Sequence, residues 1–159
     1  MTCGAPTWGS IPAIDALFFR RVHAHEIFVD GAFNGDPHPG NVMLMDDGRL
    51  GLVDYGQVKH MDKATRVAYA KLVIALAKDD AAEIRRVMRD ELGARSKNRR
   101  ADILYRLTVF WNDRNYGDDV VPPHMNIQEF LDWCEAEDPV EEIPQDTVPV
   151  GFLQSTVSD

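Results

Sequence analysis

Apolar residues near the start of the chain recur at the spacing of an α-helix. Ser10 and Pro12 form a plausible helix entrance, and Asp30 and Gly31 end the segment. Between these two signals, the apolar positions that fall close to one helical face are Ile14, Leu17, Phe18, Val22 and Phe28. The spacing therefore predicts a helix that ends near residue 30.

The pattern then changes to alternation, which is typical of β-strands. Val42 and Leu44 alternate with their neighbours on one arm, and Leu50 and Leu52 do so on the other. The connecting residues 46–48, with the sequence DDG, form a hairpin turn signature. Alternation and turn together predict a short β-hairpin.

Two helices are predicted directly after the hairpin, where the apolar period returns to that of a helix. Asp62 can cap the first helix, which runs to about Lys78 with an apolar face made of Ala64, Val67, Ala68, Leu72 and Ala75. Asp79 or Asp80 begins the second helix, which ends at Gly93 and carries the apolar residues Ile84, Val87, Met88 and Leu92.

Two further helices are predicted over residues 100–111 and 126–137, with a break forced by the prolines at 122 and 123. Asn126 opens the second of them, with Glu129 three residues later at the spacing of a capping box. We therefore expect an irregular N-terminus over residues 1–15 and a helical domain over residues 16–137. The acids, prolines and small polar residues of 138–159 predict a flexible tail.

Composition and charge narrow the class of protein. The 159 residues are 45% hydrophobic and 27% charged, a mixture that supports a packed core. The formal net charge of −9 argues against a nucleic-acid partner, because proteins that bind phosphate backbones present basic faces. Cys3 and Cys134 are too few for a disulfide framework. No apolar run approaches the roughly 20 residues of a membrane-spanning helix, and no targeting peptide is visible.

Three polar side chains stand around the predicted hairpin. Asp36 and Asn41 lie five residues apart in a loop that two prolines stiffen, and Asp54 follows the second strand. Phosphoryl transfer uses a carboxylate that orients a nucleophilic hydroxyl, together with an amide oxygen and a second carboxylate that bind Mg²⁺. The order and spacing favour this chemistry over an interpretation in which these residues only form turns.

The same order of acid, asparagine, hairpin and a final Asp-aromatic-Gly tripeptide occurs in the catalytic and metal-binding loops of kinases. Asn34 and Gly35 stand where conventional protein kinases have His and Arg. The stretches GDPHPGN and VDYGQVKHM instead resemble the aarF-domain, UbiB-like family of atypical kinases. The resemblance extends more loosely from Ala16 to about Gly93.

This resemblance implies an α+β fold, in which the chain forms the mostly helical C-terminal lobe of a protein-kinase-like fold with a short β-hairpin. It implies ATP and Mg²⁺ as cofactors, with Asp36 as the catalytic residue and with Asn41 and Asp54 as the residues that bind the metal and the cofactor. It also implies a role in isoprenoid-quinone (coenzyme Q) or prenyl-lipid metabolism. The resemblance further implies contact with a prenyl lipid or a membrane surface. In a eukaryote it implies a mitochondrial or plastid location.

The sequence also departs from that family. The chain begins too close to the catalytic loop to hold an N-terminal lobe, so we expect that lobe to be absent and the activity of the isolated chain to be weak or lost. Whether this chain is an enzyme therefore stays open. One alternative is a catalytically inactive, truncated kinase-like binding module. A second is a small-molecule kinase similar to the aminoglycoside phosphotransferases and choline kinases, whose catalytic loop is very similar.

Three other groups of side chains receive structural interpretations. His23, His25 and Glu26 lack the spacing of metal ligands and are expected to be solvated. The basic residues of 97–100, with Arg85, Arg86 and Arg89, could contact anionic lipid headgroups but are interpreted as exposed faces of amphipathic helices. The aromatic residues expected to pack in the core are Phe110, Trp111, Phe130 and Trp133.

Overall fold

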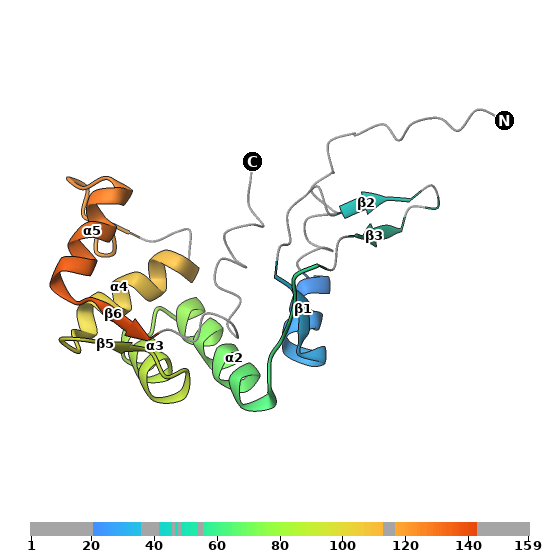
Figure 1. Ribbon diagram of the computed structural model, residues 1–159, viewed down its shortest axis with the longest axis horizontal. Helices are drawn as coiled ribbons and strands as arrows, with labels where there is room; N and C mark the ends of the chain where they lie inside the picture. The colour runs from blue at the N-terminus through green and yellow to red at the C-terminus, as the bar shows by residue number, and fades with distance from the viewer. Residues whose placement is uncertain are drawn as a thin grey trace.

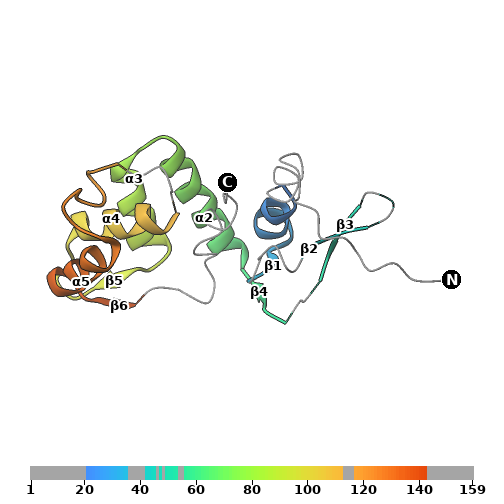
Figure 2. The ribbon, with the colours of Figure 1, turned by 90° about the horizontal axis from the view of Figure 1, so that it is seen from above.

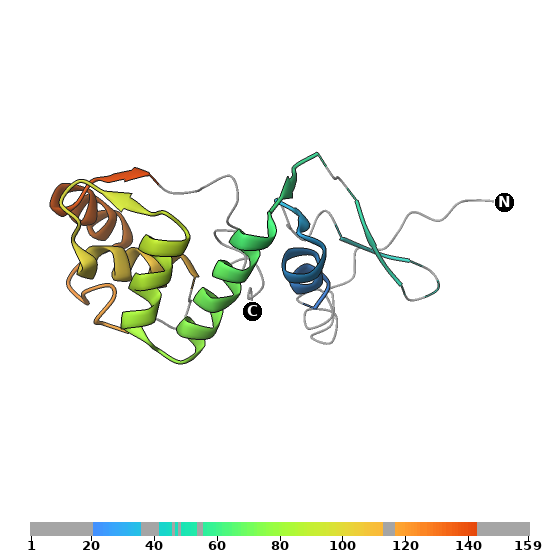
Figure 3. The ribbon, with the colours of Figure 1, turned by 90° about the horizontal axis from the view of Figure 1, so that it is seen from below.

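The fold is described by a computed structural model for residues 21–35, 42–45, 47, 49–53, 56–112 and 117–142. Within these residues the chain is mostly helical and contains three two-stranded antiparallel sheets. The α+β, mostly helical class predicted from the sequence is therefore confirmed. The helices that follow residue 62 gather at one end of the molecule, and the predicted hairpin lies at the other end (Figures 1 and 3).

A helix and a pair of strands begin the described part of the chain. The described part of the helix covers residues 21–30 and has π-helical hydrogen bonding over η1 (Glu26–Asp30). It ends at Gly31, whose φ of 72° is the left-handed conformation that favours glycine. The next strand, β1 (Ala32–Asn34), pairs antiparallel with β4 (Val58–His60). The predicted helix end near residue 30 is confirmed.

The predicted hairpin is also confirmed. Strand β2 (Val42–Leu44) pairs antiparallel with β3 (Leu50–Leu52), with Val42 opposite Leu52. In the turn, the backbone N–H and the guanidinium of Arg49 donate to the Asp47 carboxylate at 3.1 and 2.8 Å. These hydrogen bonds hold the pKa of Asp47 below its usual value. The turn is therefore stabilised by its own side chains.

Two capped helices follow β4. Helix α2 (Lys63–Ala77) begins at Asp62, whose carboxylate accepts the Thr65 N–H at 2.7 Å. Helix α3 (Ala81–Arg86) begins at Asp80, which accepts the Glu83 N–H at 3.0 Å, and it continues as η3 (Val87–Glu91). Both helices lie where the caps and the periodicity predict them.

The buried face of α2 differs in part from the predicted one. Of the residues expected on that face, Ala68, Leu72 and Ala75 are buried, whereas Ala64 and Val67 are exposed. Tyr69, which the apolar pattern omits, is completely buried instead. A buried tyrosine packs its ring like an apolar residue while its hydroxyl forms a hydrogen bond. A pattern of apolar residues alone therefore does not predict that a tyrosine is buried.

The C-terminal part adds two helices and a small sheet. Helices α4 (Ala101–Asn112) and α5 (Ile127–Glu137) lie where they are predicted. Strand β5 (Arg95–Ser96), which precedes α4, pairs antiparallel with β6 (Val140–Glu142), which follows α5. The sequence predicts a flexible tail from residue 138 onward, but residues 138–142 are part of the fold. Residues 143–159 and the N-terminal residues 1–15 lie outside the described part of the chain.

Side chains from several elements meet in one core. The large residues that are completely or almost completely buried there are Ile27, Tyr69, Leu72, Ile84, Ile103 and Phe130. Helix α2 lies between the N-terminal helix and helix α3 and contacts both (Figure 2). Phe110 and Phe130 pack as predicted, with ring centroids 5.4 Å apart, whereas Trp111 is 38% exposed. Among the described helices, none has the length and apolar character needed to cross a membrane.

The capping box of α5 gives a first testable prediction. The Asn126 side chain accepts the Glu129 N–H at 2.9 Å, and the Glu129 carboxylate accepts the Asn126 N–H at 2.8 Å. Replacing Asn126 by alanine leaves an N-terminal N–H of the helix without its acceptor, so we expect the free energy of unfolding to fall by about 1 kcal/mol. Urea denaturation measures this change. Gln128→Ala, at an exposed position of the same helix, is the control, and equal effects of the two variants would contradict the prediction.

Candidate functional site

The residues predicted to carry the chemistry, Asp36, Asn41 and Asp54, lie outside the described residues. Residues beside them in the chain are described and form two strand pairs. Among the residues that the structure describes, no group of three or more His, Cys, Asp or Glu side chains could hold a metal ion. The structure therefore describes the strands that lead into and out of the loops of the predicted site.

The first strand pair joins the segment before Asp36 to the segment after Asp54. Asn34 lies opposite Val58 in the β1–β4 ladder, and the Gly35 N–H donates to the Gln57 carbonyl at 2.8 Å. Gly35 directly precedes Asp36 in the chain. Backbone hydrogen bonds thus connect the entrance of the predicted catalytic loop to the exit of the predicted metal-binding segment.

Gly35 has a structural reason to be glycine at this junction. A Cβ atom at this position would lie 2.9 Å from the Gln57 carbonyl oxygen and 3.1 Å from Cε of Lys59. The first distance is shorter than a carbon and a backbone oxygen tolerate, so the two strands can approach this closely only without a side chain at residue 35. The close approach of the two strands therefore accounts for glycine at residue 35.

The second strand pair joins the segment after Asn41 to the segment before Asp54. Asn41 directly precedes β2, and Asp54 follows the last residue of β3 by two positions. Val42 lies opposite Leu52 in the register of this hairpin. The two described ends of the hairpin are therefore adjacent, in the manner that the sequence predicts.

A buried histidine and a partly buried glutamate lie in the helix that precedes β1. His23 Nδ1 is 2.8 Å from Glu26 Oε2, and the two side chains are 2% and 17% exposed. Burial lowers the pKa of His23 and raises the pKa of Glu26, and the nearby Asp30 raises the latter further. The prediction that these residues are solvated is wrong for His23, because the helix turns it into the protein; His25 is exposed as expected.

One face of the hairpin presents apolar side chains to solvent. Met43 and Met45 are 44% and 46% exposed, and Val53 is 38% exposed. The register places Met43 opposite Gly51, and residues two apart along a strand share a face, so the three side chains lie on one side of the sheet. This face is available for contact with another protein surface.

Four of the basic residues interpreted as exposed helix faces, Arg85, Arg89, Arg99 and Arg100, also line a pocket. Its arginines are Arg85, Arg89, Arg95, Arg99 and Arg100. Sequence reasoning missed Arg95, because the two-residue strand that carries it has no recognisable period. The signal that could have found it is the concentration of arginines between residues 85 and 100 in an acidic chain.

Comparison with known proteins identifies the N-terminal half of the described chain. The sequence model of the ABC1 atypical kinase-like domain matches residues 14–88, a segment that includes Asp36, Asn41 and Asp54. This match, together with a relative named as an AarF domain-containing protein kinase, confirms the resemblance of this segment to the aarF-domain atypical kinases. No solved structure matches the chain.

Several curated proteins are similar to the same part of the chain. An uncharacterized protein of Synechocystis is 41% identical over 68 residues, which are 43% of this chain and 16% of that protein. The chloroplastic protein ACTIVITY OF BC1 COMPLEX KINASE 1 of Arabidopsis thaliana is 37% identical over 54 residues, or 34% of this chain and 8% of that protein. The AarF domain-containing protein kinase 1 of Gallus gallus is 34% identical over 79 residues, which are 46% of this chain and 15% of that protein. The chain thus spans a small part of the length of these relatives.

Proposed function

We propose that this chain supplies the catalytic loop and the metal-binding segment of an atypical kinase or ATPase that uses ATP and Mg²⁺. The observation that carries the proposal is that Asp36, Asn41 and Asp54 fall inside the matched kinase-like segment. Their order and spacing are those of the kinase catalytic machinery. The two strand pairs that flank their loops support the same arrangement.

Each of these residues has a chemical role in the proposal. The Asp36 carboxylate orients the attacking hydroxyl or water and accepts its proton. The Asn41 amide oxygen and the Asp54 carboxylate bind the metal, and hard oxygen ligands of this kind fit Mg²⁺, which keeps positions free for phosphate and water. When bound, Mg²⁺ neutralises the charge on the phosphate oxygens of ATP. The outcome is phosphoryl transfer to an acceptor or hydrolysis of ATP.

The wider role proposed for the chain follows from the family. We place the activity in isoprenoid-quinone (coenzyme Q) or prenyl-lipid metabolism, with residues 16–137 as part of a C-terminal kinase lobe. Two relatives from Arabidopsis thaliana are named as chloroplastic, which supports a plastid location in a eukaryote over the mitochondrial alternative. Prenyl lipids or a membrane surface are the partners expected beside ATP.

Titration of a fluorescent ATP analogue into the purified chain tests the site. We expect saturable binding in the presence of Mg²⁺, and we expect Asp54→Ala to weaken it by about tenfold or more, because one charged ligand of the metal is lost. Asp47→Ala is the matched control, since Asp47 is an exposed acid in the turn of the same hairpin and pairs with Arg49. Binding that ignores Mg²⁺, or that falls equally in both variants, would contradict the proposal.

A second candidate function is a kinase-like binding module without catalytic activity. The exposed apolar face of Met43, Met45 and Val53 favours it, because such a face fits another protein surface or a second lobe. Under this alternative the chain binds no nucleotide, and Met43→Ser with Met45→Ser weakens the capture of its protein partner. The nucleotide titration separates the two candidates, since only the first predicts loss of binding in Asp54→Ala.

A further inference from the structure

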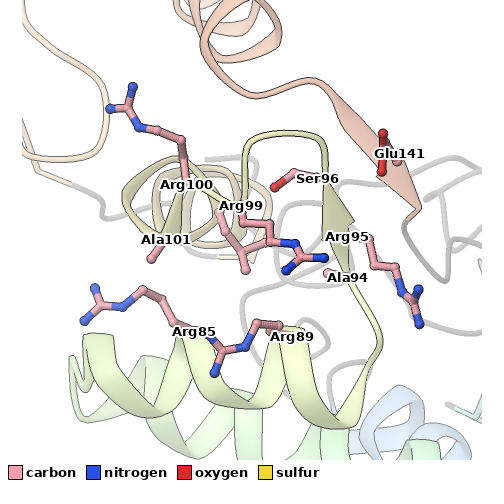
Figure 4. Close-up of a pocket in the computed structure, with 10 residues that line it drawn as sticks. Arg85, Arg89, Ala94, Arg95, Ser96, Arg99, Arg100, Ala101 and Glu141 are labelled. Atoms are coloured by element: carbon pink, nitrogen blue, oxygen red, sulfur yellow. The ribbon is translucent and has the colours of Figure 1, made fainter.

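A pocket of about 520 Å³ lies between the helical segment formed by α3 and η3 and the segment formed by β5 and the start of α4. Figure 4 shows Arg85 and Arg89 on the helical side, Arg95, Arg99 and Arg100 on the opposite side, and Glu141 on β6 at the margin. Ligand-binding pockets of proteins typically have volumes of roughly 300–1,000 Å³. The pocket is therefore large enough for a small molecule or a lipid headgroup.

The charge of this pocket is opposite to that of the chain. Five of the 17 lysines and arginines line it, together with the single acidic residue Glu141, whereas the whole chain has a formal net charge of −9. These arginines come from segments on both sides of one concavity. Such an arrangement concentrates positive potential where a ligand can enter.

The arginines differ in how far acidic neighbours neutralise them. Arg89 Nε lies 2.7 Å from Asp90 Oδ1, and Arg100 Nη2 lies 2.6 Å from Asp102 Oδ2. None of the ion pairs found among the described residues involves Arg85 or Arg99. Arg85 stacks instead over the Tyr105 ring, with its guanidinium carbon 5.9 Å from the ring centroid. Two guanidinium groups are thus left to bind an anion.

The backbone around Arg99 is held in an unfavourable conformation. Arg99 has a φ of 55°, in the left-handed region that is unfavourable for a residue other than glycine. The N–H groups on either side of it, from Asn98 and Arg100, donate to the Asp138 carboxylate at 2.6 and 2.7 Å. This buried acid fixes the loop, so Arg99 is presented to the pocket by a rigid support.

We infer that this pocket binds the phosphate or diphosphate group of a ligand through Arg85 and Arg99, with the neighbouring arginines adding positive potential. A guanidinium donates two parallel hydrogen bonds to phosphate oxygens, which makes arginine the preferred residue for such a group. The phosphate can belong to a soluble phosphorylated molecule or to a phospholipid headgroup. The site goes beyond the proposed nucleotide site, because of its arginines only Arg85 lies within the matched segment.

Isothermal titration of inorganic pyrophosphate into the full chain, without divalent metal, tests the inference. We expect binding that weakens by about tenfold or more in the double variant Arg85→Gln, Arg99→Gln, because two charge-assisted contacts are lost. Arg86→Gln is the matched control. Arg86 is the next residue along the same helix, but it pairs with Glu83 and Glu91 and does not line the pocket.

Arg99→Gly gives a second variant whose folding is not in question. Glycine accepts the left-handed conformation without strain, so this variant should keep or raise the melting temperature and still lose pyrophosphate binding. Asp54→Ala should leave this binding unchanged, which separates failure of this inference from failure of the proposed nucleotide site. Equal losses in Arg86→Gln and in the double variant would overturn the inference.

Flotation with phosphatidylcholine vesicles that contain phosphatidic acid distinguishes the two sources of phosphate. Pyrophosphate binding without vesicle binding supports a soluble phosphorylated ligand. Vesicle binding that the double variant loses and Arg86→Gln keeps supports a phospholipid headgroup. If neither pyrophosphate nor the vesicles bind, the pocket is not a phosphate site and the inference is wrong.

Discussion

Replacing Asp138 by alanine is expected to lower the free energy of unfolding by about 3 kcal/mol. Asp138 is completely buried, and its carboxylate accepts hydrogen bonds from the Ser96 hydroxyl at 2.6 Å and from the N–H groups of Asn98 and Arg100 at 2.6 and 2.7 Å. Alanine removes all three bonds and leaves the donors without their acceptor. Each hydrogen bond to a charged group contributes about 1.5–3 kcal/mol, and relaxation of the loop recovers part of that sum.

The position of Asp138 explains why a single side chain has so large an effect. It is the C-cap residue of α5, and its hydrogen bonds reach the loop that connects β5 to α4. The Asn98 side chain adds a bond to the Glu137 carbonyl at 2.8 Å. Loss of Asp138 therefore separates two segments that are about forty residues apart in sequence. The same variant should weaken pyrophosphate binding, because the loop that presents Arg99 loses its support.

Asp138 also predicts a dependence of stability on pH. Burial raises the pKa of Asp138, but the hydrogen bonds from Ser96, Asn98 and Arg100 outweigh it and hold the pKa below its usual value. A carboxyl group whose pKa is lower in the folded state stabilises the fold above its unfolded pKa of about 3.9. This contribution is lost as the pH falls through the folded pKa. Wild-type stability should thus fall in acid more steeply than that of Asp138→Asn.

Urea denaturation at neutral and acidic pH measures both effects. Asp132→Ala is the control, because Asp132 is an exposed acid of the same helix whose carboxylate accepts a hydrogen bond from the Gln128 amide. We expect this control to change the free energy of unfolding by less than about 0.5 kcal/mol. A similar small change in Asp138→Ala would show that the buried carboxylate does not hold the loop.

The elements that the sequence predicts correctly depend on residues close together in the chain. Asp62 and Asn126 cap the helices that follow them, and both caps can be predicted because a cap and its N–H donor lie three residues apart. The hairpin can be predicted for the same reason, since its turn lies between its strands. The individual helices and the hairpin can therefore be predicted from short-range patterns, whereas the kinase-like fold class is implied by the resemblance of the motifs.

Contacts between residues far apart in the chain could not be predicted from the sequence pattern. Strands β1 and β4 have three residues each, which is too short for a periodic pattern to predict their pairing. The acidic and proline-containing residues around Asp138 predict a flexible tail. They give no sign of its hydrogen-bond partners, which lie far away in the sequence. For the candidate site, the motif supplies the identities of Asp36, Asn41 and Asp54. The structure adds the strand frame and the reason for Gly35.

The second large effect is expected for Tyr69→Ala, which should lower the free energy of unfolding by about 4 kcal/mol. Tyr69 is completely buried, and its ring stacks on Phe28 with centroids 5.9 Å apart. Its hydroxyl donates to the Asn112 side-chain oxygen at 3.3 Å. Truncation of a large buried aromatic residue costs roughly 3–5 kcal/mol, because it removes apolar burial and leaves a cavity.

Comparison with Tyr69→Phe separates the ring from the hydroxyl. Burial raises the pKa of Tyr69, so the hydroxyl stays protonated and able to donate. Its removal should cost only about 1 kcal/mol, the contribution of one neutral hydrogen bond. Val67→Ala is the control on the same helix, because Val67 is 47% exposed, and it should have a much smaller effect than Tyr69→Ala. Equal losses in Tyr69→Ala and Val67→Ala in thermal denaturation would contradict this account of the core.

Tyr69 also connects the two parts of the molecule on which the proposals depend. Phe28 belongs to the helix that leads into β1 and the predicted catalytic loop, whereas Asn112 ends α4 on the side of the C-terminal helices. If these contacts hold the two parts together, Tyr69→Ala should weaken Mg²⁺-dependent nucleotide binding at temperatures where the chain is still folded. Tyr69→Phe keeps the ring between Phe28 and the core and should retain that binding.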